Sequence, residues 1–231
     1  MFYFDPLYII MIGPCILLAL WAQARVKMAF DKYSKVRATS GLTGADAARE
    51  VMRSAGINDV QVEEVQGFLS DHYDPRSKTL RLSPQVYRGQ SLASVGVAAH
   101  EAGHAIQHSR NYALLEARTF IVPMAGLGDK LAFPIIFLGF IFHALSLVKV
   151  GIILFSIIVL FQIITLPVEF DASSRAKKVL ASTGIISGSA EAGGVAAVLN
   201  AAAMTYVAAT ISTAATLLYY LLRSGLLGGR R

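Results

Sequence analysis

The residues most capable of chemistry in this chain are two histidines and a glutamate within five positions, His100-Glu101-Ala102-Gly103-His104. On an α-helix, residues four apart lie one above the other on the same face, so both imidazoles can reach one metal ion. Glu101 directly follows the first histidine, where its carboxylate can hold a water molecule beside the metal and take its proton. Two ligands and a base at this spacing are typical of zinc hydrolases.

A catalytic zinc ion has three protein ligands and one open position, so a further donor is needed. The acids and histidines expected on the same side of the membrane are Glu116, Glu169, Asp171, Glu191 and His108. His108 lies about 12 Å along the helix from His100, too far to share a metal with both histidines of the motif. Glu169 is favoured, because an acid that follows Pro167 at the end of an apolar segment is costly without a partner. The alternative is that Glu169 only offsets a helix dipole.

The composition is that of a membrane protein. Of the 231 residues, 55% are hydrophobic and only 16% are charged, against about 25% charged in typical soluble domains. The single cysteine, Cys15, excludes an internal disulfide and fits a reducing compartment. The net charge is +6, but the basic residues are spread among acids, which favours contact with a lipid bilayer and argues against nucleic-acid binding.

Residues 7–24 carry no charge and are just long enough to span a bilayer, so they predict an N-terminal anchor. A cleaved signal peptide is the alternative. The residues ahead of this segment contain Asp5 and no basic side chain, which argues against a signal peptide.

Residues 119–168 are predicted to form two more membrane spans, at 119–142 and 150–168, and residues 195–222 a fourth. The span at 119–142 contains prolines and two charged side chains. It therefore has an alternative as a re-entrant or amphipathic segment, followed by a span at 131–148.

The remaining regions, 25–118 and 169–194, are predicted to lie on one side of the membrane, because two spans separate them. Both have basic residues next to the spans, so the positive-inside rule places this catalytic side in the cytoplasm. Four complete spans would put Arg223 and the two C-terminal arginines on the other side, against that rule. The predicted fold class is mainly α, with about four membrane helices and a small α+β catalytic domain.

Within 25–118, a helix is expected from Thr43 to Gly56 and the motif helix from Ser91 to about His108. Alternating residues around Val60 and Val62 predict a strand, Asp71 to Lys78 a turn, and Thr79-Leu80-Arg81-Leu82 a second strand. The two strands together suggest a β-hairpin ahead of the motif helix.

The combination of the motif, two apolar spans and Glu169-Phe170-Asp171-Ala172 resembles integral-membrane gluzincin proteases. The closest resemblance is to the YugP-like neutral zinc metallopeptidase family. It extends over nearly the whole chain, through Asp71-His72-Tyr73-Asp74-Pro75, Leu80-Arg81-Leu82-Ser83, Leu166-Pro167-Val168-Glu169-Phe170 and Asn200-Ala201-Ala202-Ala203. The resemblance implies a zinc-dependent endopeptidase of a bacterial-type inner membrane, with Glu169 as the third ligand and membrane or membrane-proximal proteins as substrates.

The more distant HtpX-like proteases carry an aspartate four residues after this glutamate, where this chain has Ser173. The role of that aspartate is therefore in doubt here, with Asp171 as the nearest acid. In such enzymes the strand ahead of the motif helix binds substrate, which implies this role for Thr79, Leu80, Arg81 and Leu82. An exposed sheet edge would fit it, and an ordinary structural hairpin is the alternative. His72 and Tyr73 are candidates for lining the cleft, or are turn residues.

Two functions from different classes remain. One is a membrane zinc endopeptidase, and the other is a metal-binding scaffold or transporter without proteolytic activity. The complete motif favours the enzyme, because a structural zinc site needs no glutamate base. The chain contains no G-x-x-x-x-G-K-[ST] segment, so it has no P-loop of its own.

Overall fold

The computed structural model describes residues 5–67 and 70–227. The chain divides into two compact units. Unit 1 contains the segment that ends at Ala22, Ala117–Leu166 and the segment that begins at Thr205. Unit 2 contains Gln23–Glu116 and Pro167–Met204.

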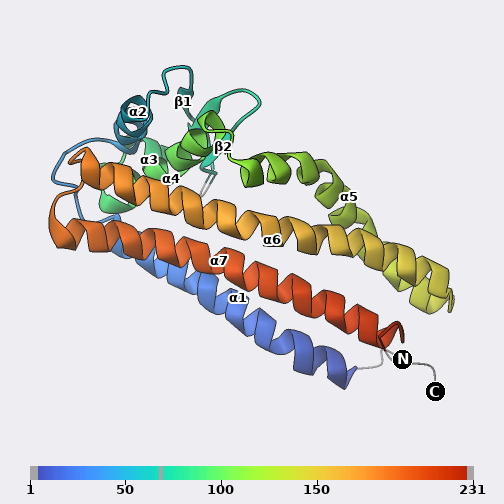
Figure 1. The fold of residues 1–231 in the computed structure, drawn as a ribbon. Helices are drawn as coiled ribbons and strands as arrows, with labels where there is room; N and C mark the ends of the chain where they lie inside the picture. Colours follow the sequence, from blue (N-terminus) through green and yellow to red (C-terminus); the bar gives the residue numbers. More distant parts are fainter. Residues whose placement is uncertain (1–4, 68–69, 228–231) are drawn as a thin grey trace. The chain divides into compact units, whose positions relative to one another are not determined.

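Long apolar helices form unit 1. In the described ranges, four helices are long and apolar enough to cross a membrane: α1 (Pro6–Tyr33), α5 (Ala113–Ile141), α6 (Leu145–Ser182) and α7 (Gly188–Arg223) (Figure 1). Three predicted spans fall within one of them, and the span predicted at 119–142 extends one residue past the end of α5. Large apolar side chains on these helices are widely exposed, among them Leu17, Phe120, Phe133 and Ile153. Such exposure is unfavourable in water and is expected for helices that face lipid.

The alternative span at 131–148 is wrong, because α5 ends at Ile141 and α6 begins at Leu145. Helix α5 is continuous from Ala113 to Ile141, with Pro123 and Pro134 inside it. It packs closely on α6, where a Cβ atom on Gly139 would lie 2.7 Å from Val148 Cγ2 and 2.8 Å from its backbone nitrogen. Small residues allow membrane helices to approach in this way, and neighbouring helices help to tolerate proline.

Unit 2 is built around the motif helix α4 (Leu92–Ser109), α2 (Gly44–Ser54) and the short α3 (Pro84–Arg88). The side chain of Thr43 accepts a hydrogen bond from the Asp46 backbone and so caps α2, and Ser91 caps α4 in the same way. Apolar faces of α2 and α4 share one core, to which Val51, Met52, Val95, Ala98 and Ala102 contribute fully buried side chains.

The sheet of unit 2 differs from the predicted hairpin. Its described strands are β1 (Gln61–Glu64), β2 (His72–Asp74) and β3 (Thr79–Leu82), in the order β1-β3-β2. β1 pairs with β3 in parallel, and the hairpin partner of β3 is β2. The prediction that residues 71–78 are only a turn was therefore wrong. A three-residue strand is too short to show alternation, and the Asp-Pro turn signal belongs to the residues that follow it.

Helices α4 and α6 make a close backbone contact in unit 2. A Cβ atom on Gly103 would lie 2.5 Å from the carbonyl oxygen of Ala172. Ala172 and its neighbour along the helix face, Ala176, are fully buried. Gly103, inside the motif, therefore sets how near α6 approaches the histidines.

Substitution of Gly103 by alanine is expected to lower the stability of the protein by about 1–3 kcal/mol, because the new methyl group forces the two backbones apart. Thermal unfolding in detergent measures this as a lower melting temperature. Gly193→Ala in α7 is the control, since nothing lies within 4 Å of its Cβ position. Equal melting temperatures for Gly103→Ala and the unmodified protein would contradict the close packing.

Candidate metal centre

Helices α4 and α6 bring three candidate ligands together. His100 and His104 lie one turn apart on α4, with ring centroids 4.8 Å apart. Glu169 of α6 lies against both, its Oε2 atom 3.1 Å from His100 Nε2 and 3.6 Å from His104 Nε2. The ligand atoms of the three residues all lie within 4.8 Å of one another. The structure thus groups the three residues that the sequence favoured as ligands.

The donor set and spacing fit a zinc ion. Bonds of about 2.0–2.1 Å in a tetrahedral site place donor atoms about 3.3 Å apart. The two distances from the Glu169 oxygen to the imidazole nitrogens lie on either side of that value. Two imidazoles and one carboxylate also leave the fourth position that a catalytic site requires.

A buried glutamine orients His104. Gln107 Nε2 donates hydrogen bonds of 2.8 Å to the Val168 carbonyl and to Asp171, so its Oε1 atom must be the acceptor that faces His104 Nδ1 at 3.0 Å. A His104 that binds a metal through Nε2 would therefore carry its proton on Nδ1, toward the Gln107 oxygen.

Ser173 holds the other histidine. Its hydroxyl lies 3.1 Å from His100 Nδ1, so the position four residues after Glu169 contacts a ligand although it is not an aspartate. Asp171 acts further back, accepting hydrogen bonds from Gln107 and from Arg175, the latter at 2.5 Å. Gln107 and Arg175 are not among the site residues predicted from the sequence. Their spacing was a usable signal, since Gln107 is three residues after His104 on the motif helix and Arg175 is four after Asp171.

Glu169 is ionised in this environment. Only 2% of the residue is exposed, and burial alone raises the pKa of a carboxyl group. The hydrogen bonds with His100 and His104 outweigh burial and hold the pKa of Glu169 well below its usual range. The charged form, which binds a cation, is thus the stable one. Glu101, the candidate base, is also buried, with 9% of the residue exposed.

The other sequence candidates for the third ligand lie in different surroundings. Glu116 is exposed on α5. Glu191 accepts hydrogen bonds from the backbones of Thr39 and Ser187. The Tyr73 hydroxyl lies 2.8 Å from His108 Nδ1, and burial together with nearby aspartates raises the pKa of Tyr73 to about 12.

The premise of the substrate-strand prediction is wrong. β3 is the central strand of the described sheet, so its backbone groups are already paired with β1 and β2. Thr79, Leu80 and Leu82 are buried, and Arg81 forms ion pairs with Glu63 and Asp74. His72 lies instead on the edge strand β2, exposed, with Nδ1 2.8 Å from the Ser70 carbonyl oxygen.

Known proteins match the chain over most of its length. A family model described as "Putative neutral zinc metallopeptidase" matches residues 8–225. The chain belongs to this family. A curated relative, "Putative membrane protease YugP" of Bacillus subtilis (strain 168), is 49% identical over 206 residues, which cover 89% of this chain and 91% of the relative. No solved structure matches the chain. The family resemblance noted in the sequence is confirmed.

Replacement of Glu169 by glutamine is expected to remove most bound zinc, because it takes away the negative ligand. The loss should exceed the about 10–100-fold reduction in affinity that removal of a ligand's hydrogen-bond partner causes. Metal content of the purified protein measures it. Glu116→Gln, the same change at an exposed position, should keep its zinc. Unchanged metal content in Glu169→Gln would place the third ligand elsewhere.

Replacement of Gln107 by leucine should reduce zinc affinity about 10–100-fold, because His104 Nδ1 loses its acceptor. Competition with a chromophoric chelator measures this affinity. Gln107→Glu keeps an acceptor toward His104 and should retain more affinity than the leucine variant. Equal affinities for the two variants would show that Gln107 only fills space.

Proposed function

We propose that this chain is a membrane-embedded, zinc-dependent endopeptidase that hydrolyses peptide bonds of membrane or membrane-proximal proteins. The observation that supports it most is the grouping of His100, His104 and Glu169 within 4.8 Å, next in sequence to the buried acid Glu101. Membership of a zinc metallopeptidase family, and four helices able to cross a bilayer, agree with it.

In this proposal His100, His104 and Glu169 hold the zinc ion, which when bound polarises the peptide carbonyl and makes water a stronger nucleophile. Glu101 takes a proton from the attacking water and later donates it to the nitrogen of the leaving amine. Ser173 contacts Nδ1 of His100 and Gln107 contacts Nδ1 of His104, so both Nε2 atoms would be left to bind the metal.

The peptide substrate would bind in extended form along an edge of the sheet, where unpaired backbone groups can accept an added strand. β2 is the proposed edge rather than β3. β2 packs on the motif helix α4, and its Tyr73 contacts His108 of that helix. His72, exposed on the same strand, would lie along the substrate.

The catalytic face is proposed to be cytoplasmic, since the segments next to the spans at 25–118 and 169–194 are basic. Arg223 at the end of α7 is the exception to the positive-inside rule. Its Nε atom lies 3.3 Å from Asp5, so a neighbouring acid offsets this charge.

Substitution of Glu101 by glutamine is expected to keep zinc but to lower the rate of casein cleavage in detergent about 100- to 10,000-fold, the usual contribution of a general base. Glu116→Gln is the matched control and should cleave at the rate of the unmodified protein. A chelator should abolish that cleavage and added zinc should restore it. Substantial proteolysis by Glu101→Gln with zinc bound would overturn the assigned role. A zinc-loaded unmodified protein that cleaves no peptide would favour the scaffold alternative.

A further inference from the structure

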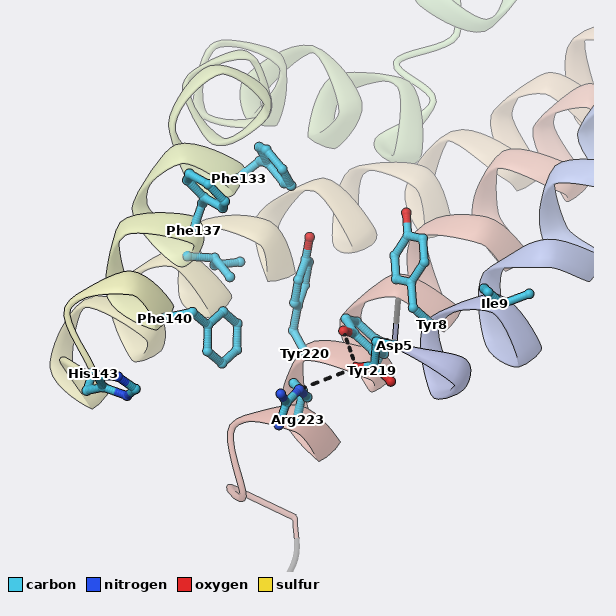
Figure 2. Close-up of a pocket in the computed structure, with 11 residues that line it drawn as sticks. Asp5, Tyr8, Ile9, Phe133, Phe137, Phe140, His143, Tyr219, Tyr220 and Arg223 are labelled. Carbon is cyan, nitrogen blue, oxygen red and sulfur yellow. Dashed lines mark hydrogen bonds and ion pairs between the residues drawn. The ribbon is translucent and has the colours of Figure 1, made fainter. Parts of the chain in front are cut away.

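Unit 1 contains a cavity of about 850 Å³. It lies between the first turn of α1, the last turns of α5 and the end of α7 (Figure 2). Six phenylalanine and tyrosine rings and the His143 imidazole line it; the six are Tyr8, Phe133, Phe137, Phe140, Tyr219 and Tyr220. Helices α1, α5 and α7 each have an end here, so in a chain with four spans the cavity lies near one surface of the bilayer. Aromatic rings are common at that depth, but here rings from three helices surround a single space.

One end of the cavity is charged. Asp5 caps α1, because its Oδ1 atom accepts a hydrogen bond from the Leu7 backbone N–H. Its Oδ2 atom accepts a hydrogen bond of 2.8 Å from the Tyr219 hydroxyl. The same oxygen lies 3.3 Å from Arg223 Nε. Both Asp5 oxygens are therefore engaged. The Arg223 side chain is 60% exposed, so its remaining N–H groups have room to bind phosphate oxygens, which match the guanidinium geometry.

The size of the cavity selects its occupant. A helix that spans the bilayer is about 10 Å wide and 30 Å long, or on the order of 2,000 Å³, and the cavity offers less than half of that volume. Its volume falls instead in the range of small-molecule sites, about 300–1,000 Å³. The interior is apolar and aromatic, and at one end the exposed Arg223 guanidinium keeps N–H groups beyond its contact with Asp5. This combination matches a molecule that has a hydrocarbon chain and a phosphate headgroup.

We propose that this cavity binds one phospholipid, with an acyl chain among the aromatic rings and the phosphate on Arg223. The lipid would tie together the ends of α1, α5 and α7. The proposal is independent of peptide hydrolysis, and its test measures lipid binding rather than cleavage.

The full chain, stripped of lipid in detergent, is titrated with phosphatidylglycerol while its melting temperature is recorded. A saturable increase is expected, because a ligand that binds only the folded state stabilises it. Two partial probes are run beside it: diacylglycerol with the same chains, and glycerol phosphate without chains. Neither should reproduce the increase. An equal effect of either probe, or stabilisation by an apolar membrane-spanning peptide in place of the phospholipid, would overturn the proposal.

Two variants locate the site. Arg223→Gln removes the phosphate contact. Ile9→Trp places an indole ring in the cavity that Ile9 lines. Arg223→Gln should lower the affinity for phosphatidylglycerol about tenfold or more, the usual effect of losing a charge-assisted hydrogen bond. Ile9→Trp should also lower it, because the indole ring takes up space that the acyl chain would fill. The matched controls are Lys149→Gln and Leu17→Trp, at exposed positions outside the cavity.

Ile9→Trp keeps the ion pair of Asp5 with Arg223, so it tests the cavity even if Arg223→Gln folds poorly. Native mass spectrometry of the purified proteins gives a second measurement. It should detect one retained phospholipid per unmodified chain and less in Ile9→Trp. Affinities and lipid content that match those of the controls would contradict the proposal.

Discussion

The candidate metal centre depends on the close approach of α6 to α4. Two histidines on one helix supply only two donors, and the third comes from a residue 65 positions after His104 in the chain. Because Gly103 has no side chain, the backbone of Ala172 lies where a Cβ atom at position 103 would clash with it. Glu169, one turn earlier on α6, then reaches both imidazoles. The glycine in the motif is thus as much a part of the site as the histidines, although it carries no chemistry itself.

A polar network holds the same helix pair in register. Apolar packing tolerates small sliding movements, whereas hydrogen bonds to a buried amide do not, because each broken bond leaves a buried polar group unsatisfied. Gln107 is fully buried and bonds to His104 on its own helix and to Val168 and Asp171 on α6. One side chain therefore fixes the register of the helices and orients a candidate ligand. The ion pair of Asp171 with Arg175 orients the acceptor at the end of this chain of contacts.

The sequence predicted those parts that are encoded locally. Motif spacing identified the histidines, apolar length identified the four long helices, and the acid after Pro167 at a membrane boundary pointed to Glu169. Strand pairing could not be predicted in this way, because β2 has three residues and its partner is chosen by tertiary packing. The role of Ser173 was hidden for a related reason. A hydroxyl can accept from an imidazole wherever the backbone places it, so residue type alone does not show the contact.

In unit 1, a paired charge holds the start of α1 to the end of α7. A charge near the bilayer is costly unless it is paired, and the pairing of Arg223 with Asp5 joins residues 218 positions apart in the chain. This contact, with the Tyr219 hydroxyl, fastens the start of α1 to the end of α7. The positive-inside rule counts lysines and arginines and is little affected by acids, so this pairing leaves Arg223 as an exception to the proposed orientation. The pairing lowers the cost of placing Arg223 near the bilayer, whichever side of the membrane it lies on.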